Sequence, residues 1–363
     1  IFNDVGLWPH SQELCELSRF FVDDGHKVYF LSSNDSFIGN PSNPLSFNLA
    51  RMVTESRNKI IHRELSNYGV NCFFISKTKN VLKNNFKDNI SEDLLNSIYG
   101  CYCEILKDGL ADRRSYHYLN FEKNALLSIE KSCNFFDLFV SKNNIQEIVV
   151  WNGRRPAEVF LIDLAKLRSI KYSSIISSQL NGRYAYKKNW SNVNDIKFYG
   201  KEIKDKIKNF NKKAFEKKSL KKSELYYKRA QGLVDKPESF NSRGFYTYSD
   251  KYKISDYLNK KILNIKYFNK KIVSIFPGTF MEYISLPDYS NDQVNSNHYE
   301  HIKFLLSLNL ENSHHFVLRF HPNQRLIRFN EKLEIKNIIT EAKLKSNFDV
   351  ILPHENVSSY EII

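Results

Sequence analysis

EIVVWNGRRPAEVFLIDLAKLRSIKYSSII, residues 147–176, decides the expected fold of this chain. The stretch opens with an apolar run at 147–151 that is typical of a buried strand, and it closes with a second such run at 172–176. Between the two runs, apolar residues recur at helical spacing over 157–169. Two strands that are joined through a helix lie parallel in one sheet, so this stretch predicts a βαβ unit.

The same alternation continues on both sides of this unit. Upstream, the pattern predicts strands at 1–5, 27–31 and 72–75 and helices at 11–24, 94–106 and 122–139, with Ser11 as a helix cap. Downstream, it predicts strands at 271–276, 316–320 and 348–352, helices at 298–308 and 331–345, and a helix that starts at Ser358. Strands alternating with helices predict an α/β protein with two Rossmann-like domains, each built on a parallel sheet covered on both faces.

Changes in composition set the expected domain boundaries. The first domain is predicted to span 1–185 and the second 271–363, and we expect the second to be incomplete because it supplies too few strands for a doubly wound sheet. Between them, 186–270 is expected to be a basic helical linker, since 201–228 contains 11 lysines and has apolar residues at helical spacing. A solvated connecting helix, contact with an anionic membrane and contact with nucleic acid all remain open for this linker.

Composition limits the class of protein and its partners. The 363 residues carry a net charge of +14, which favours ligands that bear phosphate without choosing among them. The five cysteines include no zinc-type or thioredoxin-type spacing, so reduced thiols are expected. Neither a membrane-spanning apolar run nor a signal peptide is evident, so we expect a cytoplasmic protein, with peripheral attachment to the inner face of the membrane as a further possibility.

Ligands of open α/β sheets bind beyond the carboxyl ends of the strands, so the residues that follow each strand are the candidate site. After the strand at 271–276, Gly278 lets the backbone approach a phosphate and Thr279 offers a hydroxyl donor, although a simple turn explains both residues equally. After the strand at 316–320, Arg319 is suited to clamp a phosphate and His321 adds a further donor, with a structural histidine as the alternative.

Two further groups of residues complete the candidate site in the C-terminal half. Asn323 lies in the same loop as the histidine, behind a proline that fixes the turn. Ser358 and Ser359 stand where the N-cap and first turn of the next helix belong, and such a helix start favours an anion. Ordinary helix capping explains the two serines equally well.

These motifs together resemble a known group of enzymes. An apolar strand ending in R-x-H-P-N, followed by a helix, a short strand and the loop V-S-S-Y-E-I-I, is similar to the nucleotide-binding half of capsular and lipopolysaccharide glycosyltransferases of the GT-B type. It also resembles bacterial polysialyltransferases, Kdo transferases and teichoic acid glycerophosphotransferases. The resemblance implies two domains facing a cleft, and it implies that Arg319, His321, Ser358 and Ser359 bind the phosphates of a CMP- or CDP-activated sugar. The sequence ends before the glycine- and serine-rich segment and the glutamate that follow in the family.

The N-terminal half is expected to hold the acceptor, a growing glycan or a lipid-linked glycan. Its N-G-R turn is similar to a cleft-facing loop of capsule glycosyltransferases, which implies that Asn152 and Arg154 bind substrate, although a tight turn with a solvated arginine is the alternative. For the general base we consider His10, Asp4 and Asp112, each of which has an equally plain structural explanation. The resemblance implies transfer without a metal or another cofactor.

Two other classes of function stay open. Non-hydrolysing sugar-nucleotide epimerases share the two-domain architecture and also bind nucleotide sugars. A basic nucleic-acid-binding protein would account for the lysine-rich segment, but the sequence lacks a zinc finger, an RNP-like aromatic motif and a helix-turn-helix.

Overall fold

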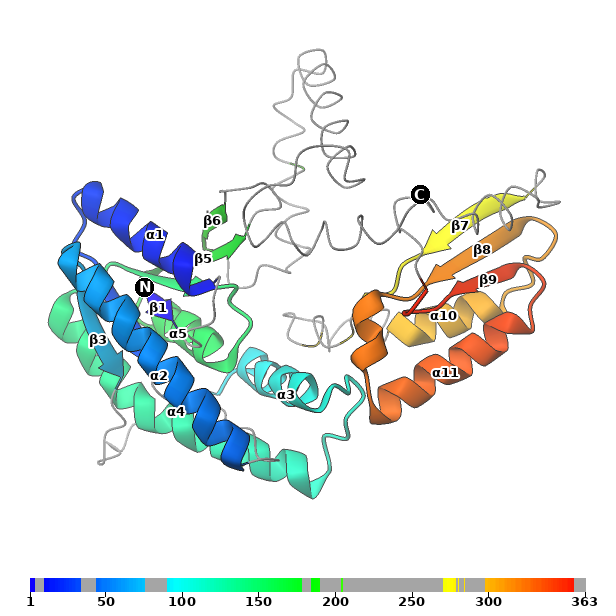
Figure 1. The fold of residues 1–363 in the computed structure, drawn as a ribbon, viewed down its shortest axis with the longest axis horizontal. Helices are drawn as coiled ribbons and strands as arrows, with labels where there is room; N and C mark the ends of the chain where they lie inside the picture. Colours follow the sequence, from blue (N-terminus) through cyan, green and yellow to red (C-terminus); the bar gives the residue numbers. More distant parts are fainter. Residues whose placement is uncertain are drawn as a thin grey trace, which may run out of the picture. The chain divides into compact units, whose positions relative to one another are not determined.

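The fold is described by a computed structural model over residues 1–3, 10–33, 44–75, 90–177, 184–189, 204, 270–278, 280, 284 and 298–355. Over these ranges the chain is α/β, with one six-stranded and one three-stranded sheet (Figure 1). The chain divides into two compact units. The first comprises Ile1–Ile105, Asp112–Asp195 and Ile284–Pro287, and the second comprises Leu106–Ala111, Ile196–Tyr283 and Asp288–Ile363.

The first unit alternates strands with helices along the chain. Its elements are β1 (Phe2–Asn3), α1 (His10–Asp23), β2 (Tyr29–Ser33), α2 (Pro44–Asn67), β3 (Asn71–Ile75), α3 (Glu92–Leu106), α4 (Tyr116–Asn143), β4 (Glu147–Trp151), α5 (Pro156–Leu167), β5 (Lys171–Ser177) and β6 (Tyr184–Lys188). The sheet order is β3-β2-β1-β4-β5-β6, with β1 to β5 parallel. The predicted βαβ unit is therefore confirmed as β4–α5–β5.

Two elements of this unit were not expected from the sequence. Strand β6 pairs antiparallel with β5, so the expectation of a purely parallel sheet was wrong. Helix α2 escapes a search for apolar periodicity because its buried side includes the polar residues Asn58 and His62 beside Ile61 and Leu65.

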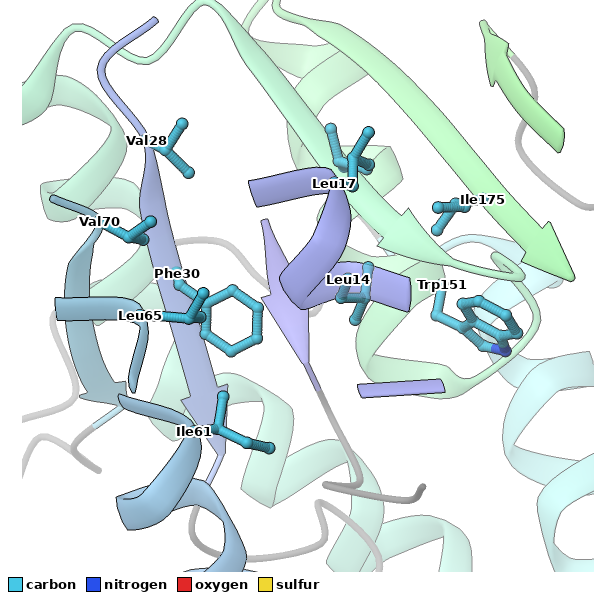
Figure 2. Packing of buried hydrophobic residues seen from close by; sticks show 10 residues of the cluster. Leu14, Leu17, Val28, Phe30, Ile61, Leu65, Val70, Trp151 and Ile175 are labelled. Carbon is cyan, nitrogen blue, oxygen red and sulfur yellow. The ribbon is translucent and has the colours of Figure 1, made fainter. Parts of the chain in front are cut away.

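The core of the first unit follows the two-residue period of its strands. On one face, side chains of β2, β4 and β5 pack against α1 and α2 (Figure 2); the labelled cluster is Leu14, Leu17, Val28, Phe30, Ile61, Leu65, Val70, Trp151 and Ile175. On the alternate positions, Phe2 meets Phe136 of α4 edge to face, with 5.8 Å between the ring centroids. Phe136 in turn contacts Phe160 of α5, so helices bury both faces of the sheet.

The second unit contains a short parallel sheet. Its elements are β7 (Lys271–Ile275), α10 (His298–Ser307), β8 (His314–Arg319), the 3-10 helix η3 (Pro322–Leu326), α11 (Phe329–Lys343) and β9 (Phe348–Ile351). The order is β7-β8-β9, and α10 and α11 lie on one face of this sheet (Figure 1). All three strands and both helices agree with the sequence prediction. The helix expected from Ser358 and most of the predicted linker 186–270 lie outside the described residues.

A segment from between α3 and α4 forms part of the second unit. The carboxylate of Asp108 accepts hydrogen bonds from the backbone N–H groups of Asn330 (3.1 Å) and Glu331 (2.9 Å), and so caps the N-terminus of α11. The Glu331 carboxylate accepts from Gly109 N and from the Tyr299 hydroxyl, each at 2.6 Å. This capping residue lies more than 220 positions from the helix it caps, so local sequence gives no sign of it.

Gly109 is needed for this segment to pack closely. A Cβ atom at this position would lie 2.7 Å from Cδ1 of Phe280 and 3.0 Å from Oε2 of Glu331. Any larger residue would therefore push the segment away from α11 and break the bond from Gly109 N to the carboxylate.

The core assignment predicts that Phe30→Ala destabilises the first unit by about 3–5 kcal/mol, because Phe30 is fully buried and its removal leaves a cavity. Chemical denaturation followed by circular dichroism measures this change. Phe20→Ala is the matched control, since Phe20 is 58% exposed and its removal should change little. Equal losses for both variants would contradict the assigned core.

The buried carboxylate predicts a pH-dependent stability in the second unit. Burial raises the pKa of Glu331 above its ordinary value, because the ionised carboxylate is less stable away from water. The contribution of this group to the stability of the folded unit is therefore complete at low pH, and it is lost as pH rises through the raised pKa. Because glutamine does not ionise, the free energy of unfolding of Glu331→Gln should increase relative to that of the parent as pH rises. Denaturation curves between about pH 4 and pH 8 measure this difference, and a difference that does not change with pH would contradict the prediction.

Candidate functional site

The carboxyl ends of β7, β8 and β9 meet at one edge of the second sheet. The strands are parallel and in register, with Ile275 paired to Leu318 and Arg319 paired to Ile351. The loops that follow the three strands therefore leave the sheet side by side, at the edge where open α/β sheets bind their ligands.

The side chain of Arg319 joins two of these loops. It is only 2% exposed, and its Nη1 donates to the carbonyl oxygens of Phe320 (2.6 Å) and Leu352 (3.0 Å). A buried guanidinium is tolerated only when such partners replace water. The group expected to clamp phosphate thus ties the loop after β8 to the loop after β9, and a direct bond from Arg319 to phosphate stays a prediction.

Gln324 joins the third loop to the same edge. The side chain is 4% exposed; its Oε1 accepts from His321 N (2.7 Å), and its Nε2 donates to Gly278 O (3.3 Å). Sequence reasoning included Gln324 in the loop at 319–325 but gave it no role. The only signal was its place in a turn that begins at a proline, where a polar side chain bonds the nearby backbone.

Besides Arg319, the structure brings three of the predicted residues to this edge. Gly278 and His321 are both partly buried and are linked through Gln324. Asn323 lies on η3 between the loops, but its side chain is outside the description.

The other predicted residues of this edge, Thr279, Ser358 and Ser359, lie outside the described residues. The loop after β9 is described as far as Glu355, whose carboxylate accepts from Leu352 N at 3.0 Å. That bond closes a turn beside the Arg319 contact, three residues before Ser358.

In the first unit, the strand order places the topological switch point between β1 and β4. The N-G-R turn follows β4 there, and Asn152 (φ 57°) and Gly153 (φ 74°) adopt the left-handed conformation that these two residue types favour. Asn152 N donates to Ile175 O at 2.9 Å, which fixes the turn against β5. The Asn152 Oδ1 atom is buried and accepts no hydrogen bond within the described part of the chain.

The backbone of Arg154 is held in place by the following helix. Glu158, in the first turn of α5, accepts hydrogen bonds from the N–H groups of Arg154 and Arg155, both at 3.2 Å. The Arg154 side chain starts from this fixed backbone and is partly exposed. The turn therefore presents one arginine at the switch point.

A buried polar network holds the end of β1 at the same edge. Asn3 is 3% exposed; its Nδ2 donates to Asn58 Oδ1, and its Oδ1 accepts from the Ser11 hydroxyl, both at 3.2 Å. Ser11 was expected to cap a helix, but α1 begins at His10 and the hydroxyl bonds Asn3 instead. The network therefore joins the two ends of the segment 4–10, which carries two of the three candidate bases.

A second polar pair lies beside this network. His62 of α2 contacts the Ser32 hydroxyl at 3.0 Å, and its ring packs on Phe74 with 4.1 Å between centroids. Burial lowers the pKa of His62 to about 4, so the imidazole is neutral near pH 7. Sequence reasoning missed this histidine because its partners come from separate elements.

Of the three candidate bases, the structure describes the side chain of Asp112 but not those of Asp4 and His10. Asp4 lies outside the described residues, and His10 begins α1 with a side chain that the structure does not describe. Asp112 is exposed, and its Oδ1 accepts from Arg114 N at 2.8 Å in the turn before α4, where Ser115 is the N-cap. Asp112 thus has a local structural role, and its action as a base stays a prediction.

A cavity of about 640 Å³ opens at the opposite, amino edge of the first sheet. Its walls include His26, Tyr29, Phe139, Glu147 and Tyr186. We do not assign it as the substrate site, since it lies away from the switch point and from every loop that follows a parallel strand.

Comparison with known proteins assigns neither a family nor a function to the chain. No family model, curated protein or solved structure matches the chain. Among the described helices, none is long and apolar enough to cross a membrane.

The network at the end of β1 predicts that Asn58→Leu costs about 1–3 kcal/mol, because it leaves the buried Asn3 amide without an acceptor. Arg57→Ala, at the neighbouring exposed position, is the control and should change little. Denaturation midpoints of the two variants measure the difference, and an unchanged midpoint for Asn58→Leu would show that the network is not formed.

Proposed function

We propose that this chain is a metal-independent glycosyltransferase of the GT-B type, with two Rossmann-like domains. It would move a sugar from a nucleotide-activated donor onto a surface polysaccharide or a lipid-linked glycan, and the resemblance favours a donor linked to CMP or CDP. The observation that carries the proposal is the tied carboxyl edge of the second unit. There, Arg319 and Gln324 hold together three loops, and the two that follow β8 and β9 resemble in sequence the nucleotide-binding loops of such enzymes.

We assign binding of the nucleotide sugar donor to the second unit. Phosphate binding needs donors held in fixed positions, and the bond from His321 N to Gln324 fixes the backbone that carries the imidazole. Ser358 and Ser359 follow the described turn at 352–355, which the Arg319 contact places beside the histidine loop. We propose that these hydroxyls and the imidazole bind the leaving nucleotide phosphate.

We assign binding of the acceptor glycan to the first unit. Its switch point carries the N-G-R turn with the partly exposed Arg154, whose guanidinium suits an acidic sugar or a phosphate, and Asn152 is kept as a proposed substrate-binding residue. The general base for the acceptor hydroxyl is assigned to His10 or Asp4, because Asn3 and Ser11 hold the two ends of their segment at this edge.

The donor assignment predicts that the full chain binds one of CMP, CDP, UDP or GDP in calorimetric titration, and that His321→Ala weakens binding about tenfold or more. A hydrogen bond to a charged phosphate contributes about 1.5–3 kcal/mol, which corresponds to such a factor. His314→Ala is the matched control, because His314 begins β8, at the opposite end of that strand from the loop that carries His321.

Two results would contradict the assignment. One is the absence of binding below millimolar concentration for all four nucleotides. The other is an equal affinity of the His321→Ala variant and the parent for the nucleotide that binds. Conversion of a nucleotide sugar in the absence of any acceptor would instead identify an epimerase.

A further inference from the structure

The outward side of α11 and of the turn before it exposes large apolar side chains. Leu326, Phe329 and Leu333 are 56%, 64% and 59% exposed. Phe329 and Leu333 are four residues apart and so share one side of the helix, and Leu326 directly precedes that side. The buried side of the same helix is formed by Ile335, Ile338 and Ala342.

Basic side chains surround these apolar residues. Arg325, Arg328, Lys332 and Lys336 are all exposed, and none of them forms an ion pair with another described residue. Carboxylates are kept away from this part of the helix: Glu331 is fully buried, and Glu334 pairs with Lys303 of α10. The exposed Glu341 lies further along the helix, beyond the apolar residues. We call the seven exposed residues, Leu326, Phe329, Leu333, Arg325, Arg328, Lys332 and Lys336, the α11 face.

We propose that the α11 face docks on the surface of an anionic phospholipid membrane. Four exposed cations that pair with no described carboxylate favour an anionic partner, and negatively charged headgroups supply one at high density. Three exposed apolar side chains need a partner that also offers an apolar layer, and the boundary between headgroups and acyl chains lies within their reach. A nucleic acid backbone satisfies the cations but leaves Leu326, Phe329 and Leu333 in water, so the observations favour the membrane.

This inference goes beyond the proposed function and stands apart from it. The lysine-rich segment 201–228 was the sequence-based candidate for membrane contact, and it lies almost entirely outside the described residues. The α11 face is a different surface of the second unit: Phe329, Lys332, Leu333 and Lys336 lie on α11, while Arg325 and Leu326 lie on η3, which follows His321. Binding to lipid does not require a nucleotide, so failure of one proposal leaves the other intact.

Cosedimentation with vesicles tests the proposal. The parent chain should bind vesicles of phosphatidylcholine mixed with phosphatidylglycerol, bind phosphatidylcholine vesicles much more weakly, and lose affinity as salt rises. The double substitution Lys332→Gln and Lys336→Gln should weaken binding about 25-fold, since each charge near such a surface contributes about fivefold. Leu333→Ser should weaken it about tenfold or more at high salt, where the apolar contact dominates.

The matched control removes two charges elsewhere. Lys123→Gln with Lys142→Gln changes two exposed lysines of α4 in the first unit and should leave affinity within about twofold of the parent. All substituted side chains are exposed, and circular dichroism checks that each variant is folded.

Four results would overturn the proposal. They are no binding of the parent to anionic vesicles, equal binding to both lipid compositions, equal losses in the α11 and α4 variants, and unchanged binding of Leu333→Ser. Binding of a duplex oligonucleotide that the α11 substitutions abolish, without any vesicle binding, would assign the face to nucleic acid instead.

Discussion

The buried guanidinium of Arg319 is the interaction on which the carboxyl edge of the second unit depends. A charge removed from water is stable only if polar groups of the protein replace the water, and here the carbonyl oxygens of Phe320 and Leu352 do so. Those two carbonyls belong to the ends of neighbouring strands, so the arginine fixes the spacing of the loops that follow them. Gln324 extends the same constraint to the loop of Gly278, so hydrogen bonds within the protein hold the described part of this edge.

Much of the fold could be predicted from local sequence because most strands and helices carry the expected apolar period. β4, β5, β7, β8 and β9 each appear as an apolar run next to a helical pattern. Helix α2 could not be found in this way, since Asn58 and His62 occupy its buried side and use hydrogen bonds in place of apolar contacts. The antiparallel β6 is short and carries two lysines, so its pattern does not distinguish it from a connecting loop.

Only those residues of the candidate site that directly follow a strand could be predicted from the sequence. His321 was found because it follows an apolar strand, and the parallel register places its loop at the ligand edge. The partners that hold the edges in place come from distant parts of the chain, as with Asn3 and Asn58, or Asp108 and Glu331. Such contacts follow from the packed fold and not from any spacing in the sequence.

A crystal structure of the chain with its preferred nucleotide would test the central claim most directly. We expect the phosphate to lie within hydrogen-bond distance of the His321 imidazole and to contact the loops after β7 and β9, while Arg319 keeps its bond to the Leu352 carbonyl. A phosphate bound instead in the cavity at the amino edge of the first sheet would contradict the account. So would a structure in which the loops after β8 and β9 are no longer joined by Arg319.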